Sequence, residues 1–344
     1  MRENKPDNSE KSIVDIAEAL GVSAATVSRA LNDNPRISEA TRKRVKDKAK
    51  ELGYRHNSMA SSLRNKRSNI IGIIVPRVSM YFHSVFITAL QNKLQEEGYS
   101  LMVCQSSDSV SIEQKLAGTL YSSRVDALVV SLALYTENYS HFEGFTNRGI
   151  PLIFYDRVPT KPYPAHIIKG DDYRGGLLAG NHLIEIGSSK IAYISGPLSC
   201  SIYKERTEGL RHALSKANIH LNEKWCFYHE LTAENAWSSL RQIFSDDEKP
   251  DAIFASNDTT AVAAVQFARE QGINIPNELK IIGYSNDPRT SIITPSITSI
   301  EQYPAEMAFR VAQKLLELLR DKSKREEPDT EEIVPVTLVR RMTT

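Results

Sequence analysis

Residues 12–54 read SIVDIAEALGVSAATVSRALNDNPRISEATRKRVKDKAKELGY, and this stretch decides how the start of the chain folds. Ser12, Ser23 and Ser38 each precede a run with apolar residues at helical spacing, so we expect them to cap three helices. Gly21 stands where a glycine commonly ends a helix. Two short helices joined by about three residues that include a glycine are typical of a helix-turn-helix unit.

The outward face of the second predicted helix favours contact with DNA. It begins with Ala24 and Ala25, whose small side chains allow close approach to base edges. It also carries Arg29, whose guanidinium fork suits guanine O6 and N7. The alternative is a small helical bundle without nucleic acid, because a helix-turn-helix pattern alone is weakly specific.

Charge is distributed unevenly along the chain. Residues 1–68 contain 15 Lys and Arg against 9 Asp and Glu, a net charge of +6. The remaining residues contain 28 basic and 33 acidic side chains, a net charge of −5. A basic head on an acidic body is expected when only one end meets phosphates, so charge favours the DNA-binding interpretation.

Length and composition indicate a soluble protein of more than one domain. The 344 residues are 41% hydrophobic and 25% charged. The first residues are polar, unlike a signal peptide, and the longest apolar runs are strand-sized, so we expect no membrane association and a cytoplasmic, nucleoid-associated protein. Cys104, Cys200 and Cys226 are too widely spaced for a disulfide framework or a zinc site, so we expect reduced thiols.

From residue 69 onward, apolar strand-like runs alternate with helical patterns. This alternation predicts parallel sheets with helices on both faces, and two such sheets fit the length better than one. The predicted strands are Ile70–Val75, Ser100–Cys104, Ala127–Leu132, Pro151–Tyr155, Lys190–Ser195, Ala252–Ala255 and Lys280–Tyr284. The predicted helices include Val85–Glu97, Tyr173–Ile186, Glu205–Ala217 and Thr259–Gln271.

Two segments, Asp156–Gly170 and Tyr284–Tyr303, contain prolines and lack a clear pattern. We expect them to be irregular connections between two lobes. Open parallel sheets bind ligands outside the carboxyl ends of their strands, so a cleft between the lobes is the expected ligand site.

Asn57–Arg67 joins the head to the body. Met59, Ala60 and Leu63 would share one side of a helix that begins after Asn57. An isolated helix of this length is marginal in water, so it needs a surface that buries the apolar side. A plain flexible linker is the alternative.

Motifs in head and body together resemble the lac repressor (LacI) family of bacterial transcription regulators. They occur in the order and spacing of that family over nearly the whole chain. In the head they are Asp15–Ala17, Gly21–Asn32, Thr41–Val45, Leu52–Arg55 and Asn57. In the body they are Gly196-Pro197 with Arg206 and Gly209, Asn257-Asp258, Ile275–Glu278, Pro295–Ile300 and Val339–Arg341.

The resemblance implies the architecture. It consists of an N-terminal all-α helix-turn-helix head and an α/β two-lobed periplasmic-binding-protein-like (type I) body with parallel sheets. We place the DNA-binding domain at 1–56, a hinge helix or linker at 57–68, and the effector-binding and dimerisation domain at 69–344. The N-lobe is expected at about 69–168 and 301–330, and the C-lobe at about 169–300 and 331–344.

The resemblance also implies the DNA partner. We expect a homodimer on double-stranded palindromic operator DNA. Leu63 falls where the family inserts a leucine into the minor groove, and an apolar wedge there can bend the duplex. The DNA-contacting residues carried over are Ser23, Ala24, Ala25, Thr26, Ser28, Arg29, Asn32, Asn57, Leu63 and Arg64.

The predicted effector-binding residues are Phe82, Asp156, Arg206, Asp258 and Ser285. Arg206 and Asp258 align with family residues that face the effector, whereas Asp156 is a candidate because it lies at a predicted strand end beside the lobe crossing. Three of them have structural alternatives, because Asp258 could cap a helix, Arg206 could lie on a helix surface, and Asp156 could pair with Arg157 across the lobes.

The chain departs from the family in two loops that select the ligand. Ser285 replaces a common aspartate, and the loop Val78–Phe82 lacks a common Asn-Pro. Aspartate, arginine, asparagine and aromatic side chains favour a polyhydroxylated effector such as a sugar or sugar derivative. A purine or a phosphorylated metabolite remains the alternative.

Other function classes fit the sequence less well. A solute-binding receptor with the same body would need a signal peptide and no DNA-binding head. An enzyme is disfavoured because the histidines are scattered and the sequence shows no nucleophile elbow, P-loop or metal-ligand spacing. We therefore expect no catalytic residue, cofactor or metal. A repressor is favoured over an activator. No apolar heptads follow Val339–Arg341, so we expect a dimer without a tetramer-forming coiled coil.

Overall fold

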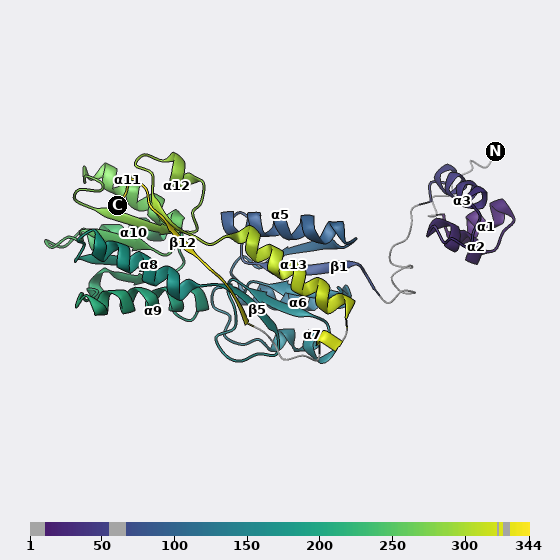
Figure 1. The fold of residues 1–344 in the computed structure, drawn as a ribbon, viewed down its shortest axis with the longest axis horizontal. Coiled ribbons are helices and arrows are strands. Elements are labelled where there is room, and N and C mark those ends of the chain that lie inside the picture. Colours follow the sequence, from purple (N-terminus) through teal and green to yellow (C-terminus); the bar gives the residue numbers. More distant parts are fainter. Residues whose placement is uncertain (1–10, 55–66, 322, 326–330) are drawn as a thin grey trace, which may run out of the picture. The chain divides into compact units, whose positions relative to one another are not determined.

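The computed structural model describes residues 11–54, 67–321, 323–325 and 331–344. The chain divides into two compact units, Met1–Ser68 and Asn69–Thr344 (Figure 1). The second unit contains two lobes, each built around a six-stranded sheet.

The head consists of α1 (Ile13–Leu20), α2 (Ala24–Leu31) and α3 (Glu39–Glu51). The caps predicted at Ser12, Ser23 and Ser38 are confirmed, since each side chain accepts a hydrogen bond from a first-turn backbone N–H. Gly21 ends α1 with a φ of +64°, a conformation that glycine adopts without steric cost. The buried residues shared by the three helices are Ile16, Ala17, Val27, Ala30, Val45 and Ala49.

The first lobe contains a wholly parallel sheet in the order β11-β5-β4-β3-β1-β2. Adjacent residues of a strand point to opposite faces, so Ile73 and Ile74 of β1 enter two different hydrophobic clusters. The strands are β1 (Ile70–Val75), β2 (Ser100–Gln105), β3 (Ala127–Val130), β4 (Leu152–Tyr155), β5 (His166–Gly170) and β11 (Glu331–Val334).

Helices cover both faces of this sheet. α5 (Tyr81–Glu96) and α13 (Pro304–Arg320) pack on the face that Ile73 enters, whereas α6 (Val110–Ser122) and α7 (Glu143–Asn147) cover the face that Ile74 enters. Two short 3-10 turns complete the lobe, Ser140–Phe142 and Ser323–Arg325.

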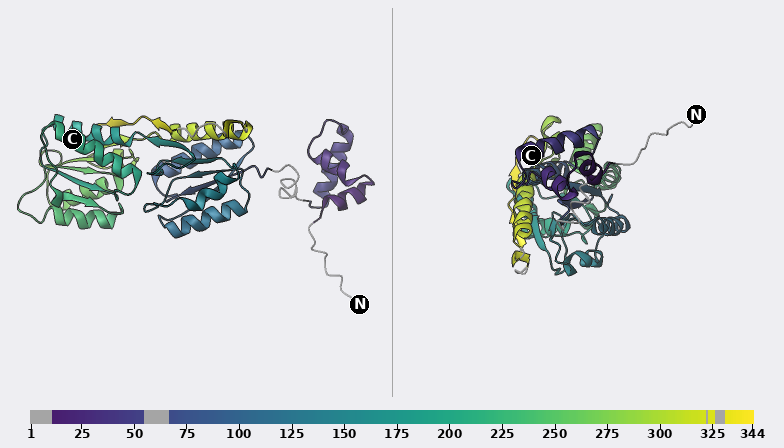
Figure 2. Two further views of the ribbon diagram at one scale, coloured as in Figure 1. Left: turned by 90° about the horizontal axis from the view of Figure 1, so that it is seen from below. Right: turned by 90° about the vertical axis from the view of Figure 1, so that its right-hand side faces the viewer.

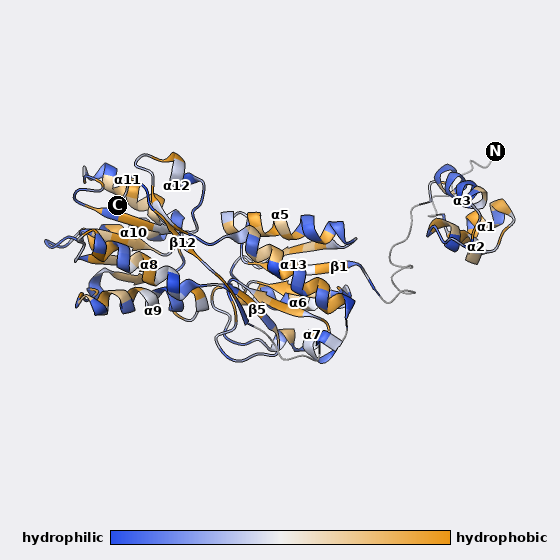
Figure 3. Ribbon diagram, in the orientation of Figure 1, coloured by the Kyte–Doolittle hydropathy of each residue, from blue (hydrophilic) through white to orange (hydrophobic). Residues whose placement is uncertain are grey.

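The second lobe contains a sheet in the order β12-β10-β9-β8-β6-β7, parallel except for the β10–β12 pair. The three central strands β6, β8 and β9 are buried almost throughout, and Figure 3 shows hydrophobic residues in orange in the sheet of this lobe. The strands are β6 (Ile191–Ser195), β7 (Cys226–Tyr228), β8 (Ala252–Ala255), β9 (Lys280–Tyr284), β10 (Thr298–Glu301) and β12 (Thr337–Val339).

Two helix pairs cover this second sheet. α10 (Ala233–Ile243) and α11 (Asp258–Glu270) pack on one face, and α8 (Asp172–Glu185) and α9 (Ser201–Lys216) on the other. The backbones of α8 and α9 approach so closely that a Cβ at Gly209 would lie 2.0 Å from the Tyr173 carbonyl oxygen. The remaining short helices are the 3-10 turn Glu223–Trp225 and α12 (Arg289–Ile292).

The described chain passes between the lobes after β5, after β10 and between β11 and β12. Figure 2 shows the last part of the chain, in yellow, running along one side of both lobes. The predicted lobe boundary was wrong for Glu331–Val334, which pairs with β5 in the first sheet instead of joining the second lobe with 337–344. The segments expected to be irregular contain β5 and β10.

None of the helices in the part of the chain described above combines the length and the apolar character needed to cross a bilayer.

Candidate DNA-reading helix and effector cleft

α2 and its two cap residues present four of the predicted DNA contacts to solvent, whereas Thr26 and Ser28 are half-buried. Ser23, Ala25, Arg29 and Asn32 are exposed. Ala24 is half-buried and packs against the head core. Arg29 is thus held on a short, capped helix with its guanidinium in solvent, which is the arrangement required for reading a major groove.

Several of these residues also hold the ends of α2 in the absence of DNA. The Ser23 hydroxyl accepts from the Thr26 N–H at 3.1 Å and lies 2.9 Å from the Thr26 hydroxyl. The Asn32 amide donates to the Ser28 carbonyl at 2.7 Å. Capping and DNA contact are compatible, since a hydroxyl or amide has further hydrogen-bonding capacity. The predicted contacts Asn57, Leu63 and Arg64 lie outside the described residues.

A cavity of about 200 Å³ opens between the two lobes of the body. It lies where the carboxyl ends of strands from both sheets meet, the position expected for a ligand in such folds. The first lobe lines it with Arg77, Met80, Asp108, Leu134 and Arg157. The second lobe lines it with Tyr203, Glu230, Leu231, Thr232, Asn257 and Thr259.

Four charged side chains form a continuous series of ion pairs through this cleft. Arg157 Nη1 donates to Asp108 Oδ1 at 2.5 Å, and Arg77 Nε donates to the other Asp108 oxygen at 3.3 Å. Arg77 Nη2 then reaches Glu230 of the second lobe at 2.5 Å. The two guanidinium and two carboxylate groups balance each other in charge, so the lining combines strong donors and strong acceptors without a net charge.

Further contacts join the lobes beside the cavity. The Ser201 hydroxyl at the start of α9 accepts from the Val158 N–H at 3.1 Å. Leu134 of the first lobe forms one apolar cluster with second-lobe Cys200, Ile202 and Tyr203. The cleft is therefore closed on one side by packed side chains.

Asp156 follows β4 and lies behind the cleft lining, 5% exposed. It accepts a hydrogen bond from the Ser131 hydroxyl at 3.2 Å. Burial raises the pKa of Asp156 to about 6, against the opposing effect of the Arg157 guanidinium. Burial also lowers the pKa of His83 to about 3, so this imidazole, 3.9 Å from Asp156, is neutral. The alternative of an Asp156–Arg157 pair across the lobes is wrong, because Arg157 pairs with Asp108.

Arg206 is 3% exposed, so the alternative of a surface helix residue is wrong. Its Nε donates to Asp172 at 2.7 Å and its Nη1 to the Ser256 carbonyl at 2.7 Å. The guanidinium carbon lies 3.5 Å from the centre of the Tyr284 ring. Arg206 thereby ties α8 and α9 to the ends of β8 and β9.

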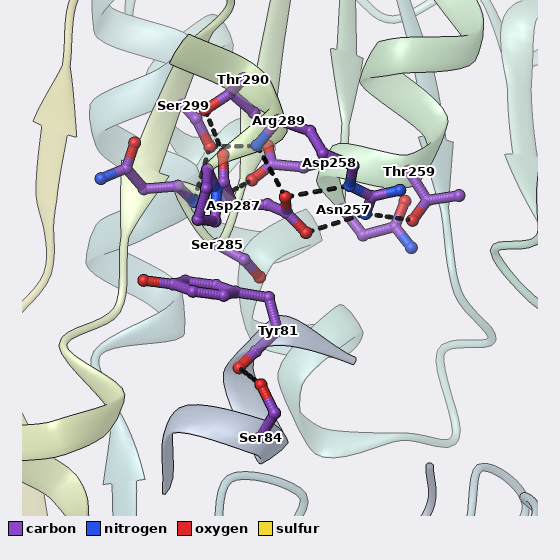
Figure 4. A network of polar contacts seen from close by, with 12 residues as sticks. Tyr81, Ser84, Asn257, Asp258, Thr259, Ser285, Asp287, Arg289, Thr290 and Ser299 are labelled. Atoms are coloured by element: carbon purple, nitrogen blue, oxygen red, sulfur yellow. Dashed lines mark hydrogen bonds and ion pairs between the residues drawn. The ribbon is translucent and has the colours of Figure 1, made fainter. Parts of the chain in front are cut away.

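Asp258 is the first residue of α11, and the helix cap is Asn257 rather than Asp258. Its carboxylate accepts from the Asp287 N–H and from the Ser299 hydroxyl, each at 2.7 Å (Figure 4). Burial raises the pKa of Asp258 to about 6, although both hydrogen bonds oppose the shift. Asp258 therefore fastens the loop after β9 to α11.

Ser285 begins this loop with a φ of +113°, and its hydroxyl donates to Gln302 at 2.7 Å. Figure 4 shows the Tyr81 ring of α5 extending toward it from the first lobe. Phe82, the next residue, is 5% exposed and packs in the first-lobe core against Phe86.

None of the five predicted effector residues lines the cavity. In three cases a near neighbour does, since Arg157 adjoins Asp156, Asn257 and Thr259 flank Asp258, and Tyr203 precedes Arg206 by one helical turn. The sequence contained a signal for Arg157 and Asn257, because each is a polar residue shortly after a predicted strand. Arg77 has the same signal, since it follows the predicted strand Ile70–Val75 by two residues, whereas nothing in the sequence placed Asp108 or Glu230 in the site.

Comparison with known proteins identifies the family. Residues 12–57 match the bacterial regulatory proteins of the lacI family, and residues 181–344 match a periplasmic binding protein-like domain. The transcriptional repressor PurR of Aliivibrio salmonicida is 31% identical over 311 residues, covering 90% of this chain and 92% of that one. The chain belongs to the lacI family.

Two further relatives agree with this assignment. The transcriptional regulator DegA of Bacillus subtilis is 32% identical over 297 residues, covering 86% of this chain and 87% of that one. The lac repressor dimer bound to operator and the anti-inducer ONPF superposes with a TM-score of 0.85 at 25% identity, covering 97% of this chain and 99% of the other. The predicted fold class is confirmed, and this LacI-family protein is a DNA-binding transcriptional regulator.

Proposed function

We propose that this regulator is a homodimeric repressor of palindromic operator DNA, controlled by a sugar or sugar derivative bound between the two lobes. Ligand in the cleft releases the protein from DNA. The observation that carries the proposal is the polar cavity at the carboxyl ends of both sheets, in a chain that begins with a DNA-reading head.

The cavity lining supports a polyhydroxylated ligand. Each sugar hydroxyl both donates and accepts a hydrogen bond, so it is best satisfied beside alternating donors and acceptors. The chain Arg157–Asp108–Arg77–Glu230 provides such an alternation, and Asn257 adds an amide. A phosphorylated ligand fits less well, because both guanidinium groups already have carboxylate partners.

A purine effector is the second candidate, favoured by the similarity to PurR proteins. A purine in a protein site is commonly held against aromatic faces. Tyr203 is the one aromatic side chain among the residues that line the cavity. A pair of stacking rings is therefore missing from the lining, and we favour the sugar-like effector.

Dimerisation is supported by exposed apolar side chains on the body and by the dimeric state of the lac repressor complex. Ile292 on α12 is 80% exposed, and Val103 on the edge strand β2 is 41% exposed. A self-complementary interface would bury such residues in both lobes at once, so lobe movement would change how the two heads are presented.

The DNA-binding part is tested by selecting an operator from random sequence and measuring its affinity by fluorescence anisotropy. Arg29→Ala should cost about 1–3 kcal/mol and relax one base position in each half-site. For the wild type, the logarithm of operator affinity should fall linearly with the logarithm of salt concentration, with a slope of roughly −0.9 for each phosphate contact. An equal loss on all sequences would show instead that Arg29 contacts phosphate.

The effector part is tested by a thermal-shift panel of neutral sugars, sugar phosphates and purine bases, followed by operator titrations with each ligand that stabilises the protein. The proposal expects a neutral sugar to raise the melting temperature and to weaken operator binding. Stabilisation by purine bases alone, or tighter operator binding with a sugar, would contradict it.

A further inference from the structure

Glu113 of α6 is a fully buried carboxylate that accepts hydrogen bonds from the loop after β3. Its Oε2 accepts from the Ala133 N–H at 2.6 Å, and its Oε1 accepts from the Thr136 hydroxyl at 2.9 Å. Oε1 also lies 3.0 Å from His141 Nε2, which donates because a carboxylate can only accept. All three donors follow β3 in the chain, so the carboxylate fastens this loop to α6.

The loop, rather than the packing of α6, accounts for a charge at this position. A buried carboxylate is costly unless hydrogen bonds and nearby charges compensate it. Glu113 lies in the first turn of α6, where the helix dipole favours a negative charge, and its three donors add to this compensation. Packing of α6 on the sheet needs only apolar side chains such as Ala117 and Leu120, which enter the cluster on that face.

The loop that Glu113 holds carries a side chain into the contact between the lobes. The chain forms no helix or strand between Val130 and the 3-10 turn that begins at Ser140. Leu134 of this loop is 3% exposed and packs in one apolar cluster with Cys200 and Tyr203 of the second lobe. Glu113 binds Ala133 on one side of Leu134 and Thr136 on the other, so it fixes where Leu134 lies.

We propose that Glu113 is a positioning residue of the regulatory response. It holds the loop after β3 so that Leu134 stays packed on the second lobe, and it thereby sets how strongly a ligand in the cleft changes operator binding. The effect on operator binding rests on the proposed function, whereas the effect on the contact between the lobes does not.

The first test follows the lobe contact without ligand, through the reactivity of Cys200. Burial raises the pKa of Cys200 to about 11, so this thiol reacts slowly while the contact is intact. Full-length protein is treated with iodoacetamide, and the labelling rates of Cys200, Cys104 and Cys226 are measured by peptide mass spectrometry. The variants are Glu113→Ala, Glu113→Gln and the control Glu137→Gln, which removes an exposed carboxylate from the same loop.

We expect Cys200 to react at least about tenfold faster in Glu113→Ala, because the loop loses three hydrogen bonds and opens more often. Glutamine keeps an acceptor oxygen for the loop, so Glu113→Gln should restore the wild-type rate, and Glu137→Gln should not change it. Cys104 and Cys226 should keep their wild-type rates in every variant. Unchanged labelling of Cys200 in Glu113→Ala, or equal acceleration of all three thiols, would overturn the proposal.

The second test measures the ratio of operator affinities without and with the neutral sugar that stabilises the protein most. Glu113→Ala, Leu134→Ala and the double variant are compared with wild type. Because Glu113 acts through Leu134, each single variant should lower the ratio by at least about threefold and the double variant no further. Leu134→Ala keeps the Glu113 anchor, so it tests the contact even if Glu113→Ala folds poorly. Losses that multiply in the double variant would overturn the proposed route.

The outcomes separate this inference from the proposed function. If a sugar weakens operator binding equally in wild type and in both single variants, the proposed function stands and the role of Glu113 is wrong. If no neutral sugar in the panel binds wild type, the proposed function fails, and the labelling of Cys200 alone decides whether Glu113 holds the contact between the lobes.

Discussion

The two lobes each bury an aspartate at the carboxyl end of the sheet, but they support it differently. Asp258 of the second lobe accepts two hydrogen bonds of 2.7 Å, one of them from a backbone N–H. Asp156 of the first lobe accepts one hydrogen bond of 3.2 Å from a serine hydroxyl. Burial raises both pKa values to about 6, so the difference lies in what each carboxylate holds in place.

The helices of the two lobes also differ in how closely their glycines approach neighbouring atoms. In the second lobe, α8 and α9 pack with direct backbone approach at Gly176 and Gly209. In the first lobe, a Cβ added at Gly118 of α6 would meet no neighbouring atom within 4 Å. The contact between α8 and α9 in the second lobe is therefore direct backbone packing, whereas Gly118 in the first lobe lies on an exposed helix position.

The largest expected effect comes from Gly209→Ala. Its methyl group would meet the Tyr173 carbonyl oxygen at 2.0 Å, and a backbone atom cannot move aside cheaply, so we expect destabilisation of roughly 3 kcal/mol or more. Gly118→Ala, on an exposed helix position, should instead stabilise by about 0.5–1 kcal/mol. Urea denaturation of both variants measures this difference. Equal effects would contradict the contrast between the lobes.

Replacing the buried aspartate of each lobe in turn should also give different losses of stability. Asp258→Ala leaves a buried N–H and a buried hydroxyl without their acceptor, so we expect the free energy of unfolding to fall by roughly 2–4 kcal/mol. Asp156→Ala strands one hydroxyl and removes a costly buried charge, so it should remain within about 1 kcal/mol of wild type. The same denaturation assay decides this. The contrast is wrong if Asp156→Ala is the more destabilised variant.

A smaller effect should appear in how the contribution of Asp156 to folding stability depends on pH. Its folded pKa of about 6 lies above the ordinary value of 3.8, so the folded state binds more protons between these values. The stability that Asp156 contributes is thus greatest at low pH and falls as pH rises from about 4 to 6. Asp156→Ala should therefore be about 1 kcal/mol more destabilising at pH 5 than at pH 7. A difference of opposite sign would refute the raised pKa.

Much of the head and of the strand arrangement was predictable from sequence, because capping residues and apolar spacing act locally. Ser12 and Gly21 delimit α1 as expected. β5 and β11 escaped prediction for different reasons. His166–Gly170 is short and follows a proline-containing stretch, whereas most of Glu331–Val334 is exposed and so has no apolar run.

The location of the cleft between the lobes was predictable from the sequence, but most of the residues that line it were not. The position of Asp156 at the end of a predicted strand made it a candidate, yet this residue has a φ of +56° and does not line the cleft, whereas Arg157 does. The pairing of Arg77 with Glu230 joins residues 153 positions apart, and such a contact depends on how the two lobes pack. Local patterns carry no information on that packing.

The most direct test of the account measures operator affinity with and without the neutral sugar identified in the panel, in wild type and in Thr259→Trp. Thr259 lines the cavity, so the indole should fill space that the ligand needs. We predict that the sugar weakens operator binding by about 5–150-fold in wild type and has no effect on Thr259→Trp. An undiminished response in Thr259→Trp would contradict control through the inter-lobe cleft.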